Sequence, residues 1–353
     1  MPFFNFFNSF FGGLKINGSD RSDLIVGSFG NDDIAGNGGN DLIFGLFGND
    51  KLAGGLGDDK IFGGFGCDIV EGGDGEDHLY GGFGNDRIVG NRGNDRMSGG
   101  RGNDLLVWNN GDGSDLMHGG SGYDRVQVNF NTDLVNDDLQ NKDVAEFSVT
   151  DEGVQFARIE VNDQTERGPF QLDVRNTETL ETNFGGGDDT AVIVDTVLDE
   201  IVLDLDGGDG VDTLDLSQAA AAVAVNLEEG TVGGSKAENF ENVTGTAFDD
   251  TITGDEQDNV IRGGAGNDVM LGGEGADTFV FFEEDAGVDV ILDFEVGVDR
   301  LQFFTTDPDV TTENLLANLT QAGDDVELAL NNKTITFDDV VVTDFDADDF
   351  LIA

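Results

Sequence analysis

The sequence predicts an all-β protein whose chain winds into a solenoid of short strands and glycine turns. One glycine recurs every nine residues, at Gly18, Gly27, Gly36, Gly45, Gly54, Gly63, Gly72, Gly81, Gly90 and Gly99. An aspartate follows each of these glycines by five residues, and an apolar residue follows each aspartate by two. Glycine fills 54 of the 353 positions, so ten such hits in a row have chance odds on the order of one in a hundred million. The pattern is therefore an internal repeat.

One repeat unit, residues 81–89, shows what each position does. Gly81, Gly82 and Gly84 allow a tight turn whose carbonyl groups point to one side, and Asp86 adds a carboxylate to that turn. The three residues that follow have room for a three-residue strand with one side chain facing inward. The inward position is apolar in every unit of the run: Ile25, Ile34, Ile43, Leu52, Ile61, Val70, Leu79, Ile88, Met97 and Leu106.

Such a core is too thin to hold the fold by itself. Each unit buries one large side chain, worth about 1.5–3 kcal/mol, whereas ordering nine residues costs about 1–2 kcal/mol each. The aspartates stack in register and repel one another. A hard divalent cation between turns resolves both problems, because Ca²⁺ takes six to eight oxygen ligands from carboxylates and carbonyls. Folding is then coupled to metal binding.

The nonapeptide G-G-x-G-x-D-x-U-x resembles the calcium-binding repeat of the RTX family, over residues 18–127 and 245–282. Nine units carry all three glycines and the aspartate: those of Asp59, Asp68, Asp77, Asp86, Asp104, Asp124, Asp212, Asp268 and Asp277. The resemblance implies a parallel β-roll or β-helix in which two nonapeptides form one coil. The Ca²⁺ ligands that it implies are Asp32, Asp41, Asp50, Asp59, Asp68, Asp77, Asp86, Asp95, Asp104, Asp115, Asp124, Asp212, Asp250, Asp268 and Asp277.

The resemblance also implies how these aspartates are arranged, with Ca²⁺ between turns that lie two repeat units apart. One edge would carry Asp23, Asp41, Asp59, Asp77 and Asp95, and the other Asp32, Asp50, Asp68, Asp86 and Asp104. Asp115 and Asp124 follow a two-residue insertion near Trp108 and Asn109. The first block would hold roughly eight to ten Ca²⁺ ions. We expect a doubtful site at Asp23, where serine and arginine replace two glycines, and a weak or missing site at Asn259.

The chain divides into five segments by composition. We expect a Phe-rich amphipathic segment, an RTX β-roll, an all-β insert, an irregular β-helix with a second RTX block, and a C-terminal β cap with a secretion signal, at 1–17, 18–128, 129–183, 184–282 and 283–353. The first segment fits a capping helix at residues 3–14, a surface anchor or disorder. A short helix is expected near Thr312–Leu319.

Charge and cysteine content bound the class of partner and the compartment. The net charge of −56 and the pI of about 4.1 argue against nucleic acid and anionic membranes as partners. No apolar stretch is long enough to form a membrane-spanning helix, so we expect no transmembrane segment. Cys67 is the only cysteine. The resemblance implies type I secretion read from the C-terminus, where residues 346–353 are acidic and then apolar, and a secreted, extracellular or cell-surface location.

Nothing in the sequence requires an active site. There is no H-E-x-x-H motif, and the two histidines, His78 and His118, fall on outward strand positions. Ser121 belongs to a repeat turn and not to a G-x-S-x-G motif, and Cys67 has no histidine nearby in the pattern. We therefore predict a non-enzymatic protein without a catalytic residue.

Three functions stay open from the sequence, of which the first leads. It is a secreted RTX protein whose folding outside the cell is driven by Ca²⁺, with a surface or matrix role. The second is a module that binds carbohydrate or polyanions, such as surface glycans, through two columns on one face of the roll: Phe44, Phe62 and Tyr80 beside Lys60, His78 and Arg96. Packing or stacking alone also explains these columns. The third is an enzyme with a site in residues 129–205.

Overall fold

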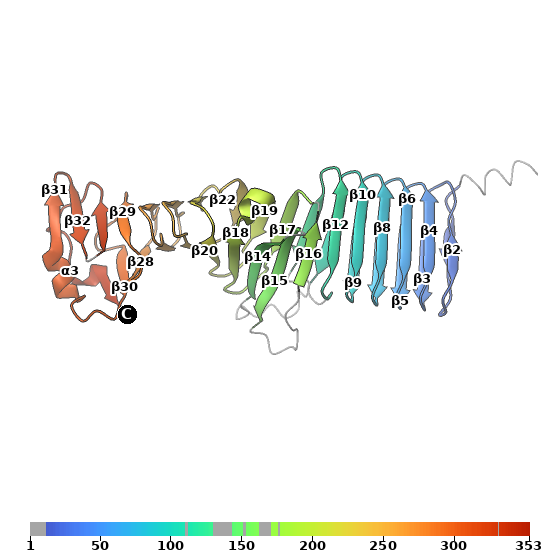
Figure 1. The fold of residues 1–353 in the computed structure, drawn as a ribbon, viewed down its shortest axis with the longest axis horizontal. Coiled ribbons are helices and arrows are strands. Elements are labelled where there is room, and N and C mark those ends of the chain that lie inside the picture. Colours follow the sequence, from blue (N-terminus) through green and yellow to red (C-terminus); the bar gives the residue numbers. More distant parts are fainter. Residues whose placement is uncertain are drawn as a thin grey trace, which may run out of the picture. The chain divides into compact units, whose positions relative to one another are not determined.

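The computed structural model describes residues 12–109, 112–129, 143–150, 153–161, 171–175, 177–330 and 332–353. Two compact units divide the chain (Figure 1). The N-terminal unit comprises Met1–Asp137, Val149–Gly185 and Ile201–Asp204, and the C-terminal unit comprises Asp138–Ser148, Gly186–Glu200 and Leu205–Ala353. Most of the predicted Phe-rich helix, residues 3–11, lies outside the described residues. None of the helices in the described ranges is long and apolar enough to span a membrane.

The N-terminal unit is a parallel β-solenoid, as predicted. Its first strands are β1 (Lys15–Asn17), β2 (Leu24–Val26), β3 (Asp33–Gly38), β4 (Leu42–Phe47), β5 (Lys51–Leu56), β6 (Lys60–Phe65), β7 (Ile69–Asp74), β8 (His78–Phe83), β9 (Arg87–Arg92) and β10 (Arg96–Arg101). Odd-numbered strands pair with odd and even with even, always in parallel. Figure 1 shows the even-numbered strands side by side. Partners such as Asp33 and Lys51 lie two repeat units apart in the sequence, so two nonapeptides form one coil.

The coil lengthens first where the insertion was predicted. Beyond β10 come β11 (Leu105–Asn109), β12 (Leu116–Ser121) and β13 (Arg125–Asn129). Arg96 of β10 pairs with Leu116 of β12, a longer step than the two repeat units that separate the earlier partners. The extra turn buries Trp108, which is 1% exposed and whose indole N–H donates to Gly113 O over 2.9 Å. The insertion therefore enlarges one coil without breaking the register of the next.

The inward column forms the core of the roll. All ten predicted apolar positions are buried, and Ile25, the most exposed of them, is 6% exposed. The expectation of three-residue strands is wrong in this block, since β3 to β10 have six residues each. The strand continues because its second inward position is also glycine. In β6, Ile61 and Gly63 both face inward, and a Cβ on Gly63 would lie 2.6 Å from Gly81 O.

The central residues contribute further strands in the described ranges. These are β14 (Asp143–Thr150), β15 (Gly153–Val161), β16 (Gln171–Arg175) and β17 (Thr179–Asn183). β16 pairs in parallel with β12, and β17 pairs in parallel with β13, so both add to the coils of the N-terminal unit. β15 is antiparallel to β16.

The C-terminal unit repeats the parallel winding with shorter strands. Its elements are β18 (Thr190–Asp195), α2 (Val197–Glu200), β20 (Thr213–Ala219), β21 (Ala224–Asn226), β22 (Thr231–Val232), β23 (Ser235–Glu238), β24 (Asn242–Thr244), β25 (Thr251–Thr253), β26 (Val260–Arg262), β27 (Val269–Leu271), β28 (Thr278–Phe282), β29 (Gly287–Ile291) and β30 (Arg300–Phe304). β19 (Val202–Asp206) is divided between the two units, with its first three residues in the N-terminal one. Here β25, β26 and β27 do have the predicted three residues. One row pairs β20, β24, β26, β28 and β30 in parallel, and another pairs β21, β25, β27 and β29.

The last residues close the unit with a different topology. They form α3 (Thr312–Asn318), β31 (Leu319–Ala322), β32 (Asp325–Ala329), β33 (Lys333–Phe337), the 3-10 helix η1 (Ala347–Asp349) and β34 (Phe350–Ile352). α3 confirms the predicted short helix, and the Thr311 hydroxyl caps it by accepting from Asn314 N. β31, β32 and β33 form an antiparallel sheet, while β33 pairs in parallel with β29. A buried cluster of phenylalanines, Phe294, Phe337, Phe345 and Phe350, fills the interior.

Candidate metal sites: a ladder of buried aspartates

The repeat aspartates form two continuous hydrogen-bonded rows along the N-terminal unit, which we call the carboxylate ladder. On one edge, Asp59 Oδ1 accepts from Asp41 N, and Asp77 Oδ1 accepts from Asp59 N, each over 2.7 Å. On the other edge, Asp50, Asp68 and Asp86 are linked in the same way over 2.8 Å. The two edges and the step of two repeat units match the arrangement that the sequence predicts. We call each of these carboxylates, with the turn that carries it, a rung of the ladder. The backbone N–H of one rung therefore holds one carboxylate oxygen of the next rung in place.

The second oxygen of most ladder carboxylates is buried and has no hydrogen-bond donor among the described residues. This holds for Asp41, Asp50, Asp59, Asp68, Asp77, Asp86, Asp95, Asp104, Asp115, Asp124, Asp212, Asp268 and Asp277. A buried carboxylate oxygen without a partner is costly, and a protein rarely leaves one so. Thirteen of them at the same position in successive rungs therefore indicate a ligand that supplies positive charge.

The space beside these oxygens is bounded by other oxygens. At the rung of Asp68, a Cβ added to Gly63 would lie 2.5 Å from Asp68 Oδ2 and 2.6 Å from Gly81 O. The carboxylate and the carbonyl thus face one small space that glycine leaves open. A hard cation prefers this donor set of carboxylate and carbonyl oxygens.

The backbone conformation of the residue four positions before each aspartate decides whether the second carboxylate oxygen has a donor. We call a rung open when this oxygen has no donor and closed when it has one. Gly64, four before Asp68, has φ +117°, and Leu46, four before Asp50, has φ +83°. Wherever the residue four positions before an open rung's aspartate lies in the described ranges, it has this left-handed conformation. These residues are Asn37, Leu46, Gly55, Gly64, Gly73, Gly82, Asn91, Gly100, Gly120, Gly208, Gly264 and Gly273. In this conformation the amide of that residue does not donate to Oδ2.

Two predicted ligands, Asp32 and Asp250, belong to rungs that the protein closes itself. Ser28 N donates to Asp32 Oδ2 over 2.6 Å, and the Ser28 hydroxyl donates to Oδ1 over 2.8 Å. Thr246 N donates to Asp250 Oδ2 over 2.6 Å. Neither Ser28 nor Thr246 has a positive φ. Their carboxylates are buried in the ladder but already have donors, so these two rungs offer less to a metal than the open ones.

Two further positions match the doubts that the sequence raised. Asp23 is closed by Ser19, whose N–H donates to Asp23 Oδ2 over 2.7 Å and whose hydroxyl donates over 2.8 Å. At Asn259, Oδ1 lies beside the Gly254 position and accepts from Asp255 N over 2.8 Å, while the side-chain amide donates to Glu241 O over 2.9 Å. Both rungs are filled by the protein's own donors.

Sequence reasoning missed several ladder members. Asp189 is 1% exposed, and its N–H donates to Asp212 Oδ1 over 2.6 Å. The run of three glycines that precedes Asp188 and Asp189 was the available signal. Glu241 accepts from Asp212 N over 2.7 Å, and Asp289 accepts from Asp268 N over 3.1 Å. These two carry no full nonapeptide, so the repeat pattern could not identify them.

Burial sets the protonation of the ladder in the absence of metal. Desolvation raises the pKa of Asp59, Asp77 and Asp86 to about 7, and neighbouring aspartates of the same edge add to the rise. The bond from the backbone N–H of the preceding rung lowers the pKa but only in part. Burial raises the pKa of Asp115 further, to about 8. Burial thus disfavours the charged form of these carboxylates when no cation is beside them.

No set of three or more His, Cys, Asp and Glu side chains gathers around one point in the described ranges. A cation in the ladder would therefore take its ligands from few carboxylates and from turn carbonyls, which suits Ca²⁺ better than a transition metal. His78 and His118 lie on strands of the roll, and His78 Nε2 lies 3.2 Å from Arg96 Nη1. Cys67 is exposed in its turn.

The aromatic and basic columns predicted on one face of the roll are both present. Phe44, Phe62 and Tyr80 stack with ring centroids 5.0 and 4.7 Å apart and planes within 6°. Lys60 pairs in register with His78, and His78 with Arg96, on the same strands. The Lys60 ammonium lies 5.4 Å from the Phe62 ring centroid and 5.7 Å from that of Tyr80. A second stack, of Phe29, Phe47, Phe65 and Phe83, lines one edge and is 40–48% exposed.

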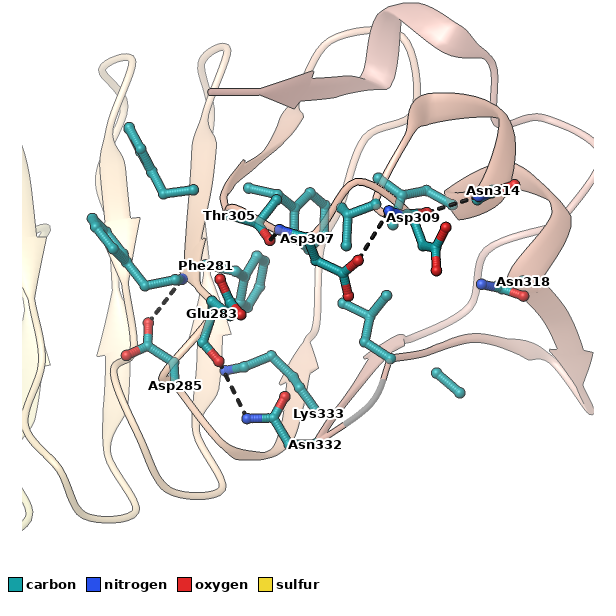
Figure 2. Close-up of a pocket in the computed structure, with 17 residues that line it drawn as sticks. Phe281, Glu283, Asp285, Thr305, Asp307, Asp309, Asn314, Asn318, Asn332 and Lys333 are labelled. Carbon is teal, nitrogen blue, oxygen red and sulfur yellow. Dashed lines mark hydrogen bonds between the residues drawn. The ribbon is translucent and has the colours of Figure 1, made fainter.

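A cavity of about 510 Å³ opens in the C-terminal unit, where carboxylates and amides surround a floor that includes Phe281 (Figure 2). Two of its acidic side chains, those of Glu283 and Asp285, have partners within the unit. Glu283 accepts from the Thr306 N–H and hydroxyl over 3.1 and 3.0 Å, and Asp285 accepts two bonds from the Arg262 guanidinium. We assign these two carboxylates a structural role.

Two solved structures resemble the fold, at low overall similarity. The extracellular lipase LipA from Serratia marcescens is 21% identical with a TM-score of 0.34, and the match covers 79% of this chain but only 40% of the lipase. The AlgE6R3 subunit of the Azotobacter vinelandii mannuronan C5-epimerase is 24% identical with a TM-score of 0.19, covering 45% of this chain and 72% of that subunit. No curated protein matches the chain.

A family model gives the decisive comparison. The RTX calcium-binding nonapeptide repeat matches at residues 17–52, 36–70, 44–79, 71–106, 110–135 and 244–279. These segments contain the open rungs of the ladder from Asp41 to Asp124, together with those of Asp268 and Asp277. The matched segments therefore carry the RTX calcium-binding nonapeptide repeat.

Proposed function

We propose that the open rungs of the ladder bind Ca²⁺ and that this binding drives folding of the roll. The observation that carries the proposal is the set of thirteen buried Oδ2 atoms without a donor. At seven open rungs, such as that of Asp68 with Gly81, a carboxylate oxygen lies beside a glycine carbonyl. Asp32 and Asp250, whose carboxylates have donors, would be weak or secondary sites.

The charge distribution supports metal binding as a condition of folding. Residues 18–128 carry 19 acidic residues, of which 12 are at the aspartate position of the repeat, and eight lysines and arginines. The ladder brings most of these acids into the interior, where their mutual repulsion is least screened. Divalent cations between rungs convert the repulsion into attraction, and their binding free energy becomes folding free energy.

A secreted, non-enzymatic role at a cell surface or in a matrix fits this chemistry. Calcium sites of extracellular modules have dissociation constants of about 10⁻⁴–10⁻³ M, a concentration found outside cells. Such a chain would cross a type I secretion apparatus unfolded and fold on meeting Ca²⁺. The acidic and apolar C-terminal residues 346–353 would serve as its signal. Deleting residues 283–353 should then keep the protein inside the producing cell.

Circular dichroism and crystallography test the calcium proposal. The protein in excess EDTA at neutral pH should lose most of its β signal, and millimolar Ca²⁺ should restore it, whereas the same concentration of Mg²⁺ should not. Anomalous scattering from Ca²⁺-grown crystals should place ions beside Asp50, Asp68 and Asp86. A β signal that chelation leaves unchanged, or crystals without ions at these rungs, would contradict the proposal.

A second candidate function is binding of an anionic polysaccharide on the face that carries Phe62, Tyr80, Lys60 and Arg96. Its support is the flat aromatic stack beside a row of basic groups. When cations neutralise the ladder, few acidic residues of the roll remain to repel an anionic ligand. We expect calcium-loaded protein to bind an acidic polysaccharide, and Phe62→Ala to bind it at least tenfold more weakly. The matched control is Phe65→Ala, which removes a ring from the edge stack instead. Equal binding by the two variants would argue against this face.

A further inference from the structure

The ladder ends in the C-terminal unit at a buried lysine. Asp289 Oδ1 accepts from Asp268 N, as Asp68 Oδ1 accepts from Asp50 N in the roll, but Asp289 Oδ2 lies 2.8 Å from the Lys333 ammonium. The side chains of Lys333 and Asp289 are 3% and 1% exposed. Lys333 reaches this position from β33, which pairs in parallel with β29. The oxygen that is open in other rungs therefore has a positive partner here, supplied by the chain.

The ammonium touches both kinds of oxygen that bound an open rung. Besides the Asp289 carboxylate, Lys333 Nζ lies 3.5 Å from Gly264 O. Gly264 has φ +103° and stands four residues before Asp268, so it is the left-handed glycine of the neighbouring rung. One carboxylate and one turn carbonyl from adjacent rungs thus meet a single cationic group.

We propose that Lys333 Nζ fills the last cation position of this edge of the ladder, so that the rung of Asp289 needs no metal. The space between Gly264 O and Asp289 Oδ2 is then a calcium site whose ion position is occupied by the Lys333 ammonium. Replacing Lys333 by a smaller residue should make this space available to Ca²⁺. This inference rests on the proposed role of Ca²⁺ in the open rungs.

The neighbouring rung supports the same conclusion for the end of the unit. Asp299 Oδ1 accepts from Asp277 N over 2.9 Å, and Asp299 Oδ2 accepts from Glu295 N over 2.8 Å. Both edges therefore end on a carboxylate whose second oxygen has a donor. Residues 283–353, which contain these two ends, should hold their fold without metal, in contrast to the open rungs of the N-terminal roll.

Hydrogen exchange of the full chain in EGTA and in about 10 mM CaCl₂ tests the proposal. In EGTA, the amides of β29 and β33 should stay protected in the natural protein. Lys333→Ala leaves a buried carboxylate unpaired, so their protection in EGTA should fall by about a hundredfold or more. Calcium should restore it, because truncation to alanine opens the cation position.

A double variant separates the cation site from simple packing. Asp289→Asn with Lys333→Met removes both charges and keeps the lysine stem, so β29 and β33 should stay protected in EGTA and not respond to calcium. Unchanged protection in Lys333→Ala, or a loss that calcium does not restore, would overturn the proposal. The amides of β5 to β9 report separately on the open rungs. If these do not respond to calcium in the natural protein, it is the proposed function that fails.

Discussion

Replacing Gly63 by alanine tests whether the space beside Asp68 Oδ2 is a cation site. The new Cβ would lie 2.5 Å from that oxygen and 2.6 Å from Gly81 O, so it would occupy the position of the ion and displace the backbone. At about 10 mM Ca²⁺, one site with a dissociation constant of about 10⁻⁴–10⁻³ M contributes about 1.4–2.7 kcal/mol to stability. Overpacking adds about 1–3 kcal/mol. We therefore expect a loss of about 2–6 kcal/mol.

The assay is denaturant unfolding at several calcium concentrations, with Gly38→Ala as the matched control. A Cβ on Gly38 makes ordinary contacts, the nearest being 3.5 Å from Asp20 Cα, and Gly38 is not left-handed. The control should therefore change stability little. Stability of the Gly63→Ala variant should also rise less steeply with the logarithm of calcium concentration, because one site is missing. An unchanged calcium dependence would show that the space beside Gly63 holds no ion, whatever the total loss of stability.

Four further predictions concern the ladder and its backbone. Replacing Asp68 and Asp86 together by alanine should raise the calcium concentration at the folding midpoint, measured by circular dichroism; an unchanged midpoint would contradict their assignment to one edge. Burial raises the pKa of Asp59 to about 7, so between about pH 4 and 7 this carboxyl ionises in the unfolded chain but not yet in the folded one. The free energy of unfolding of the metal-free protein should therefore fall as the pH rises over that range. Calcium must displace these protons, so the calcium concentration at the folding midpoint should rise when the pH is lowered from 8 to 6. A calcium titration at each pH measures this. Leu46→Gly should stabilise the calcium-loaded protein by about 1 kcal/mol in thermal unfolding, since Leu46 has φ +83°, and a loss of stability would refute the inferred strain.

The repeat spacing predicted the coil because each nonapeptide specifies its own turn and its own inward residue. The register of two units per coil and the two edges came from the resemblance to the RTX repeat, and the two-residue insertion marked the lengthened coil at Trp108. The repeat spacing misjudged strand length, since it treated Gly63 as part of a turn. In the structure Gly63 is an inward strand position, left without a side chain beside Asp68. A glycine favours a turn locally, but here the neighbouring rungs hold it in a strand.

The state of each aspartate was harder to predict than its position. Ser28 closes the rung of Asp32, and a serine or threonine four residues before an aspartate is a signal that sequence reasoning could have used. Leu46 gives no such signal, because leucine rarely adopts a positive φ. The pairing of Lys333 with Asp289 joins residues far apart in the sequence and depends on the parallel pairing of β29 with β33. Contacts of that kind arise from tertiary structure and leave no local pattern.

Several of the closed rungs stand at the end of a row, although Asp250 is closed by Thr246 within its row. Asp23 and Asp32 begin the two rows of the N-terminal unit, and Asp289 and Asp299 each end a row within the C-terminal unit. An interior rung takes oxygens from the coils on both sides, whereas a terminal rung has about half of that set and would bind a cation weakly. Serine donors, a backbone N–H or the Lys333 ammonium replace the ion there. In a solenoid each coil contacts only its neighbours. Ends that need no metal therefore offer the calcium-dependent coils a folded strand on which the next coil can form.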